Sequence, residues 1–171
     1  MFVEILKRTP PWVFVLFFAL LALGYLQSKD RVVSRGKVAI LPAAMLLLSF
    51  YGVLSAFGIT LLTLTSWLAG VGITAWLGIK SENPSGVSFA TETKTFSVPG
   101  SWLPLSLMMA IFFTKYAVGI ILARKLPIAG ELAFIGSISL IYGLLSGLFF
   151  ARAVAILRTA RVSGVSADRL K

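Results

Sequence analysis

Residues Val38 to Ile79 read "VAILPAAMLLLSFYGVLSAFGITLLTLTSWLAGVGITAWLGI", and none of them is charged. A helix needs about 20 apolar residues to cross a hydrocarbon layer of about 30 Å. The stretch therefore predicts two membrane spans, at 38–57 and 60–79, joined by a turn around Gly58. Because this turn is very short, we expect the two helices to be antiparallel neighbours.

Three more apolar runs of similar length follow the same pattern. The first begins after Thr9 and Pro10, two residues that suit the N-terminal end of a helix. The sequence therefore predicts an all-α fold, a polytopic membrane helix bundle that forms one integral membrane domain over residues 1–171. The five transmembrane helices are expected at about 11–27, 38–57, 60–79, 102–123 and 132–151, followed by a basic C-terminal tail at 152–171 that leaves the membrane.

Composition supports a membrane protein and disfavours most enzyme chemistry. The chain is 58% hydrophobic and 13% charged, whereas soluble domains are about 45–50% apolar and about 25% charged. Cysteine and histidine are absent, which removes thiol chemistry and the commonest metal ligand and general base. We expect no metal and no cofactor. The six acidic residues lie near predicted interfaces or in loops, so the sequence favours a non-enzymatic protein, although it leaves room for a lipid-modifying enzyme that uses loop residues.

The net charge of +10 raises the question of nucleic-acid binding. The basic residues lie at the ends of apolar runs and not along one polar element, so we expect no nucleic-acid partner and interpret them as orientation signals and contacts to anionic headgroups. Counting lysine and arginine at the span ends predicts an outside N-terminus and a cytoplasmic C-terminus. With this orientation the inner ends collect Lys29, Arg31, Arg35, Lys37, Lys80, Lys94, Arg152, Arg158, Arg161, Arg169 and Lys171, and the outer ends only Lys7, Arg8, Arg124 and Lys125.

The largest polar segment, residues 80–101, separates the third and fourth predicted spans. Val87 and Phe89 alternate with polar residues, as do Phe96 and Val98, with polar residues between the two pairs. This pattern predicts a short cytoplasmic β-hairpin. The alternative is a disordered loop, because so small a hairpin needs to pack on the helix ends to be stable.

Small residues recur every four positions on two of the predicted spans, which places them on one face of each helix. Such faces let helix backbones approach closely in a membrane. The sequence leaves open whether these contacts lie within one bundle or between copies of a homo-oligomer. The glycines that we expect to pack in this way are Gly70, Gly78, Gly143 and Gly147.

Lys115 lies near the middle of the fourth span, about 4 Å from the bilayer centre at 1.5 Å per residue. A lysine at this depth costs from about 2.5 kcal/mol upward unless it is paired, hydrated or functional. Three interpretations remain open: snorkelling to the surface, capping by hydroxyl and carbonyl groups, or binding of an anionic ligand or headgroup. Polar groups expected at a similar depth, which could line a pocket with Lys115, are Tyr116, Ser49, Tyr51, Ser66, Ser139 and Tyr142.

The segments "ILKRTPPWVF", "LPAAMLLLSFYGVLSAFG" and "VPGSWLPLSLMMAIFFTKYAVG" together resemble a family of small bacterial inner-membrane proteins that has only a domain-of-unknown-function label. The resemblance covers about residues 5–123. It implies a Gram-negative inner (plasma) membrane setting and a compact multi-helix fold. It implies no activity, although Lys115 and Tyr116 fall inside one of the recurring stretches.

Two classes of function follow from the sequence. In the first, the protein binds or translocates a small anionic or amphiphilic ligand, such as a membrane lipid headgroup, around Lys115. In the second, it is a structural or accessory subunit whose small-residue faces and cytoplasmic loop dock protein partners in a larger membrane complex. Co-purified lipid would favour the first class, and stoichiometric protein partners would favour the second.

Overall fold

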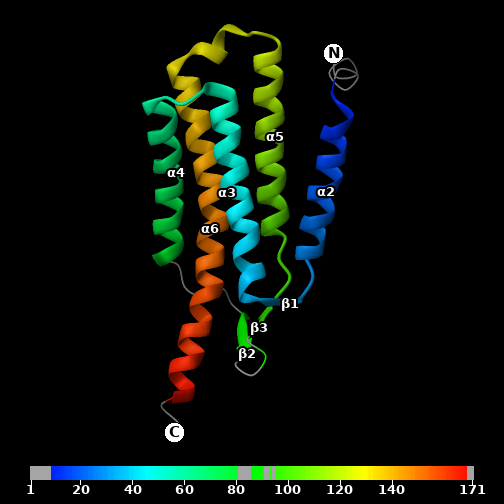
Figure 1. Ribbon diagram of the computed structural model, residues 1–171, viewed down its shortest axis with the longest axis vertical. Helices are drawn as coiled ribbons and strands as arrows, with labels where there is room; N and C mark the ends of the chain where they lie inside the picture. Colours follow the sequence, from blue (N-terminus) through cyan, green and yellow to red (C-terminus); the bar gives the residue numbers. More distant parts are fainter. Residues whose placement is uncertain (1–8, 81–85, 91–92, 94, 169–171) are drawn as a thin grey trace.

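The computed structural model describes residues 9–80, 86–90, 93 and 95–168, and these residues form a helical bundle with a small sheet at one end (Figure 1). This confirms the predicted all-α class. The helices are α2 (Pro11–Gln27), α3 (Arg35–Phe57), α4 (Leu61–Lys80), α5 (Leu103–Ala123) and α6 (Leu132–Asp168), with a 3-10 turn η1 (Pro127–Gly130) between α5 and α6.

Four helices are long and apolar enough to cross a membrane, within α3, α4, α5 and α6. The remaining helix, α2, is apolar but has only 17 residues, which corresponds to about 25 Å of helix. Beyond the expected end of the last span at residue 151, α6 continues without a break to Asp168. The part of the basic tail that the structure describes is therefore helical, and it extends past the sheet in Figure 1.

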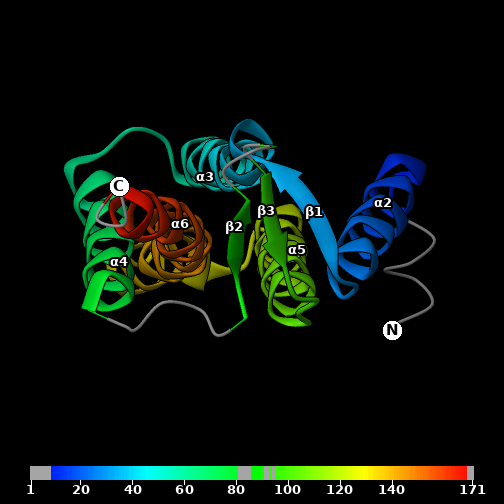
Figure 2. The ribbon, with the colours of Figure 1, turned by 90° about the horizontal axis from the view of Figure 1, so that it is seen from below.

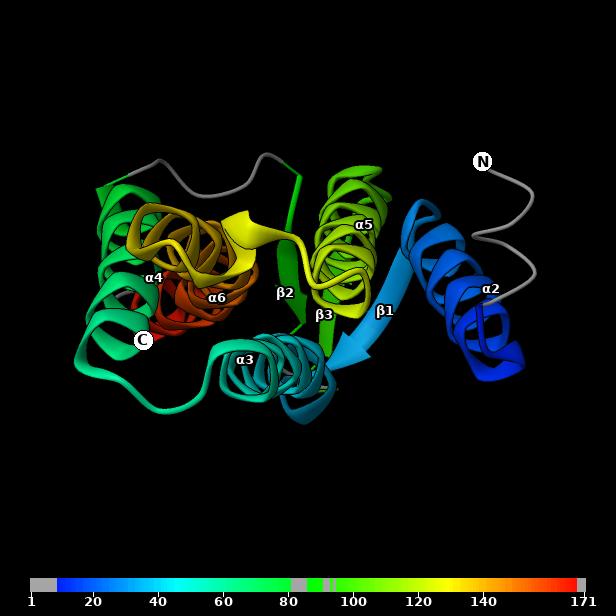
Figure 3. The same ribbon diagram turned by 90° about the horizontal axis from the view of Figure 1, so that it is seen from above.

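The long helices run roughly parallel to the long axis, and their order across the bundle is visible from above and below (Figures 2 and 3). Helix α6 packs most extensively on α4 and next on α3, while α2 packs mainly on α5. Consequently α2 lies at one edge of the molecule and α4 at the other. The predicted antiparallel arrangement of α3 and α4 is present, but the two helices contact each other much less than each contacts α6.

Small residues let α4 and α6 approach closely. An added Cβ at Gly70 would lie only 2.7 Å from the backbone nitrogen of Leu144, and one at Gly143 would collide with the carbonyl oxygen of Trp67. Such separations are far below van der Waals contact, so this interface lies inside the chain and requires glycine at both positions. The other two predicted packing glycines lie at the same interface: Gly78 faces Ala151, and Gly147 faces Thr74.

Two of the three strands form the predicted hairpin: β2 (Ser88–Ala90) pairs antiparallel with β3 (Thr95–Val98). The third strand, β1 (Arg31–Ser34), is not predicted by the sequence pattern, and it pairs with the other edge of β3, with Arg31 opposite Val98 and Ser34 opposite Thr95. Phe96 and Val98 are buried against side chains of α3 and α6. Packing against the helix ends thus stabilises the sheet, whereas an isolated hairpin has no such packing.

Candidate functional site

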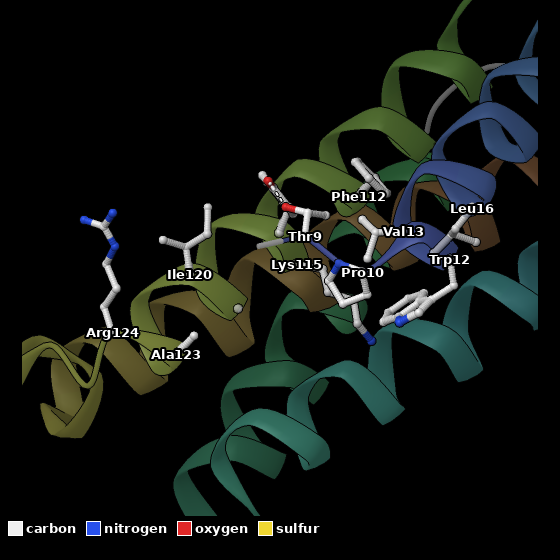
Figure 4. Close-up of a pocket in the computed structure, with 12 residues that line it drawn as sticks. Thr9, Pro10, Trp12, Val13, Leu16, Phe112, Lys115, Ile120, Ala123 and Arg124 are labelled. Atoms are coloured by element: carbon white, nitrogen blue, oxygen red, sulfur yellow. Dashed lines mark hydrogen bonds between the residues drawn. The ribbon is translucent and has the colours of Figure 1, made fainter. Parts of the chain in front are cut away.

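A cavity of about 540 Å³ lies between the N-terminal half of α2 and the C-terminal half of α5 (Figure 4). Its volume is within the range of about 300–1,000 Å³ that is usual for small-molecule sites. Most of its wall is apolar, and no carboxylate is among the lining residues within the described chain. The lining residues are Thr9, Pro10, Trp12, Val13, Leu16, Phe112, Lys115, Tyr116, Gly119, Ile120, Ala123 and Arg124.

Two cations face this cavity at different depths. Lys115 lies halfway along α5, and Arg124 follows the last residue of the helix, about 13 Å further along its axis. In Figure 4, Lys115 and Trp12 project from their helices beside each other, while Arg124 lies at the far end of the cavity. The site therefore combines an apolar wall with positive charge at its inner and outer ends.

The ammonium group of Lys115 points towards α3, where glycine leaves room for it. An added Cβ at Gly52 would lie 3.8 Å from Lys115 Nζ and 3.8 Å from the ring of Tyr142. The ring centroid of Tyr51 is 5.4 Å from Nζ, close enough for a cation–π interaction. Among the described residues no hydrogen-bond acceptor or carboxylate contacts this half-buried lysine, so its charge is only partly compensated.

Tyr116 and Thr9 connect the two helices that enclose the cavity. The hydroxyl groups of the two residues lie 2.8 Å apart and form a hydrogen bond, and the ring of Tyr116 is stacked on that of Phe112. At the opposite end of α2, the backbone N–H of Ser101 donates to the carbonyl oxygen of Gln27. These contacts hold α2 against α5 at both ends of the helix.

The predicted site residues separate into two groups. Lys115 and Tyr116 line the cavity, and the rings of Tyr51 and Tyr142 lie near the lysine ammonium group.

The three predicted serines belong instead to the packed core of α3, α4 and α6. Ser49 donates to the carbonyl oxygen of Tyr142 and accepts from the indole of Trp67, Ser66 faces Gly136 of α6, and the hydroxyl of Ser139 is buried without a partner among the described residues.

Sequence reasoning misses the half of the cavity that α2 provides. The sequence indicates only the N-terminal end of a helix at Thr9, and Trp12 is simply the second residue of the first predicted span, yet both residues line the cavity. Nothing local in the sequence pairs Thr9 with Tyr116, which lies 107 positions away. The position of Trp12 at a span start is the one available signal, since tryptophan combines a large apolar surface with a hydrogen-bond donor.

The residue types around the cavity suit binding better than bond-breaking chemistry. A lysine, an arginine and a tyrosine hydroxyl can attract and orient an acidic group, and the aromatic and aliphatic wall can cover a hydrocarbon segment. The described residues contain no group of three or more acidic, cysteine or histidine side chains that could hold a metal ion. The arrangement is that of a site for an anion with an apolar part.

These features define the class as a helical bundle with membrane-length helices, a small sheet at one end and a cationic cavity beside its edge helix. Residues 1–166 match a family described as "Family of unknown function (DUF6622)", and the chain belongs to this family. No curated protein and no solved structure matches the chain. The description of the family names no activity that could be assigned to the site.

Proposed function

We propose that the protein resides in the bacterial inner membrane and binds or translocates a small anionic or amphiphilic ligand in the cavity between α2 and α5. The observation that carries this proposal is Lys115, which lines this largely apolar cavity and whose ammonium group is only partly compensated. A buried cation without a counter-ion is costly, and an incoming anion would remove much of that cost.

The lining of the site suits an amphiphile with an acidic head. A carboxylate or phosphate would contact Lys115 or Arg124, and the hydrocarbon part would lie along Trp12, Phe112 and Ile120. In the predicted topology, with the N-terminus outside, the Arg124 end of the cavity faces the outer side of the membrane. A ligand from the outer leaflet would therefore reach the cavity at its cationic rim.

The test compares an acidic amphiphile with its neutral counterpart. The full chain is purified in mild detergent, and binding of a fatty acid and of the fatty alcohol of equal length is measured by native mass spectrometry. We expect the parent protein to prefer the acid. Lys115→Met should weaken acid binding by about tenfold or more, as expected for loss of a charge-assisted contact, and Lys115→Arg should retain part of the preference.

Lys37→Met is the matched control, because Lys37 is exposed and lies at the other end of the bundle; it should bind like the parent. Equal binding of acid and alcohol by the parent protein, or unchanged acid binding by Lys115→Met, would refute the proposal. Purification with a stoichiometric protein partner and no bound lipid would instead favour the role of an accessory subunit.

A further inference from the structure

A second cationic group lies at the sheet end of the bundle, far from the cavity between α2 and α5. Arg31 is the first residue of β1 and stands opposite Val98 of β3. Because directly paired residues project to the same face of a sheet, its side chain shares the face of Val98, which packs against α6. Arg31 is therefore directed under the ends of the helices.

The guanidinium of Arg31 is incompletely satisfied. One terminal nitrogen, Nη2, donates to Gln27 at 3.0 Å, while Nη1 is buried and has no hydrogen-bond partner among the described residues. Asp30, the neighbouring acid, accepts the backbone N–H of Gly100 at 2.7 Å. Burial lowers the pKa of Arg31 from its usual value, and no carboxylate of the described chain offsets this effect.

A second arginine aggravates the imbalance. Arg152 is half-buried on α6, next to Ala153, which belongs to the same buried cluster as Val98 of the sheet. Two arginines at the junction of the sheet and α6, one of them with a buried donor that has no hydrogen-bond partner among the described residues, are costly without a bound anion. Phosphate suits such a pair, because guanidinium groups bind its oxygens in a fork geometry.

We infer that Arg31 and Arg152 form an anion site that binds a phosphate group at the sheet end of the bundle. The side chain of Arg31 is only half-buried as a whole, and binding requires it to rotate so that the buried Nη1 meets the entering group. The site differs from general attraction between a basic surface and anionic lipid, because it depends on two particular side chains. The phosphate belongs either to a phospholipid headgroup or to a soluble ion.

The experiment measures thermal unfolding of the full chain in micelles of a non-ionic, phosphate-free detergent that contain increasing phosphatidylglycerol. Phosphatidylglycerol should stabilise the parent, and Arg31→Gln and Arg152→Gln should each require about tenfold more of it for the same shift. If Arg31→Gln does not fold, Arg152→Gln decides. A matching shift with millimolar inorganic phosphate at constant ionic strength identifies a soluble ion as the ligand, and its absence identifies the lipid headgroup.

Two controls distinguish this site from a diffuse basic surface and from the cavity between α2 and α5. Lys37→Gln removes an exposed positive charge at the same end and should respond like the parent, and Lys115→Met removes the charge of the cavity and should also keep the response. If both arginine variants keep the parent response, or if Lys37→Gln loses as much as they do, the anion site does not exist.

Discussion

Lys115 faces the ring of Tyr51 and not a carboxylate. The sequence leaves three interpretations of Lys115 open, and one of them is capping by hydroxyl groups. No described hydroxyl group forms a hydrogen bond with the ammonium group. The ammonium group points instead towards α3 at mid-helix. A cation–π contact of this kind contributes from about 0.5 kcal/mol to about 2 kcal/mol or more, against a cost of about 2.5 kcal/mol or more for lysine at the bilayer centre. The ligand that we propose would add the negative charge that this contact lacks.

Gly119 offers a way to close the cavity without removing a charge. It lines the cavity, and an added Cβ there meets nothing within 4 Å. Gly119→Leu should therefore weaken amphiphile binding strongly and leave the melting temperature equal or slightly higher, because leucine favours a helix interior by up to about 1 kcal/mol over glycine. Native mass spectrometry and thermal unfolding test both expectations.

Gly72→Leu is the matched control, since Gly72 is an exposed helical glycine with open space around it and lies outside the cavity. It should gain similar helix stability and bind ligand normally. Equal binding by Gly119→Leu and Gly72→Leu would show that the ligand does not occupy this cavity.

Ser49 is the polar residue whose loss should matter for stability and not for binding. It is fully buried, and it accepts the indole N–H of Trp67 at 2.9 Å while donating to α6. Ser49→Ala leaves that buried N–H unpaired, which costs about 1–3 kcal/mol. Thermal unfolding should show the loss, and fatty-acid binding should stay at the parent level; a variant as stable as the parent would contradict the assigned network.

At the level of elements, α4 and α6 form the most extensive contact of the fold. Gly70→Leu or Gly143→Leu puts a branched side chain where the facing helix backbone lies in contact. We expect each change to destabilise the protein by about 1–3 kcal/mol, as for other overpacking substitutions. Gly72→Leu, on the outer face of the same helix α4, should cost nothing, and equal melting temperatures for all three variants would argue against this packing.

The sequence predicts the elements that depend on local patterns. The α2 bounds at 11–27 agree with the structure, and α5 begins one residue later than expected, because a long apolar run with polar flanks marks a helix. The alternation around Phe96 predicts β3 for the same local reason. Strand β1 escapes prediction because its four residues pair with a strand more than sixty positions away, and no turn residue marks that pairing.

The candidate site is less predictable than the fold. Lys115 can be found because a charge inside an apolar run is conspicuous, and Tyr116 because it is the next residue. Ser49, Ser66 and Ser139 are not among the residues that line the cavity, because equal depth in a bundle does not by itself place residues on the same face of a pocket. Which helices are neighbours is decided by packing, and α2 lies beside α5 although more than seventy residues separate them.

At the scale of the whole molecule, the sheet and the turn η1 lie at opposite ends of the bundle (Figure 1). The sheet end holds Arg31, Lys37, Lys80 and Arg152, while Arg124 and Lys125 lie at the other end, beside η1. If the apolar bundle crosses a membrane, the two ends are exposed on different sides. The lysine and arginine bias then predicts that the sheet faces the cytoplasm.

This topology can be tested by cysteine labelling, because the chain has no cysteine of its own. Ser88 in β2 and Pro127 in η1 are exposed and lie at opposite ends. An impermeant thiol reagent applied to intact spheroplasts should label Pro127→Cys at once and Ser88→Cys only after permeabilisation. Leu47→Cys, on the outer face of α3 at 70% exposure, should resist the reagent in both conditions because lipid covers it. Labelling of Ser88→Cys in intact spheroplasts would reverse the orientation, and labelling of Leu47→Cys would show that this face of the bundle meets water.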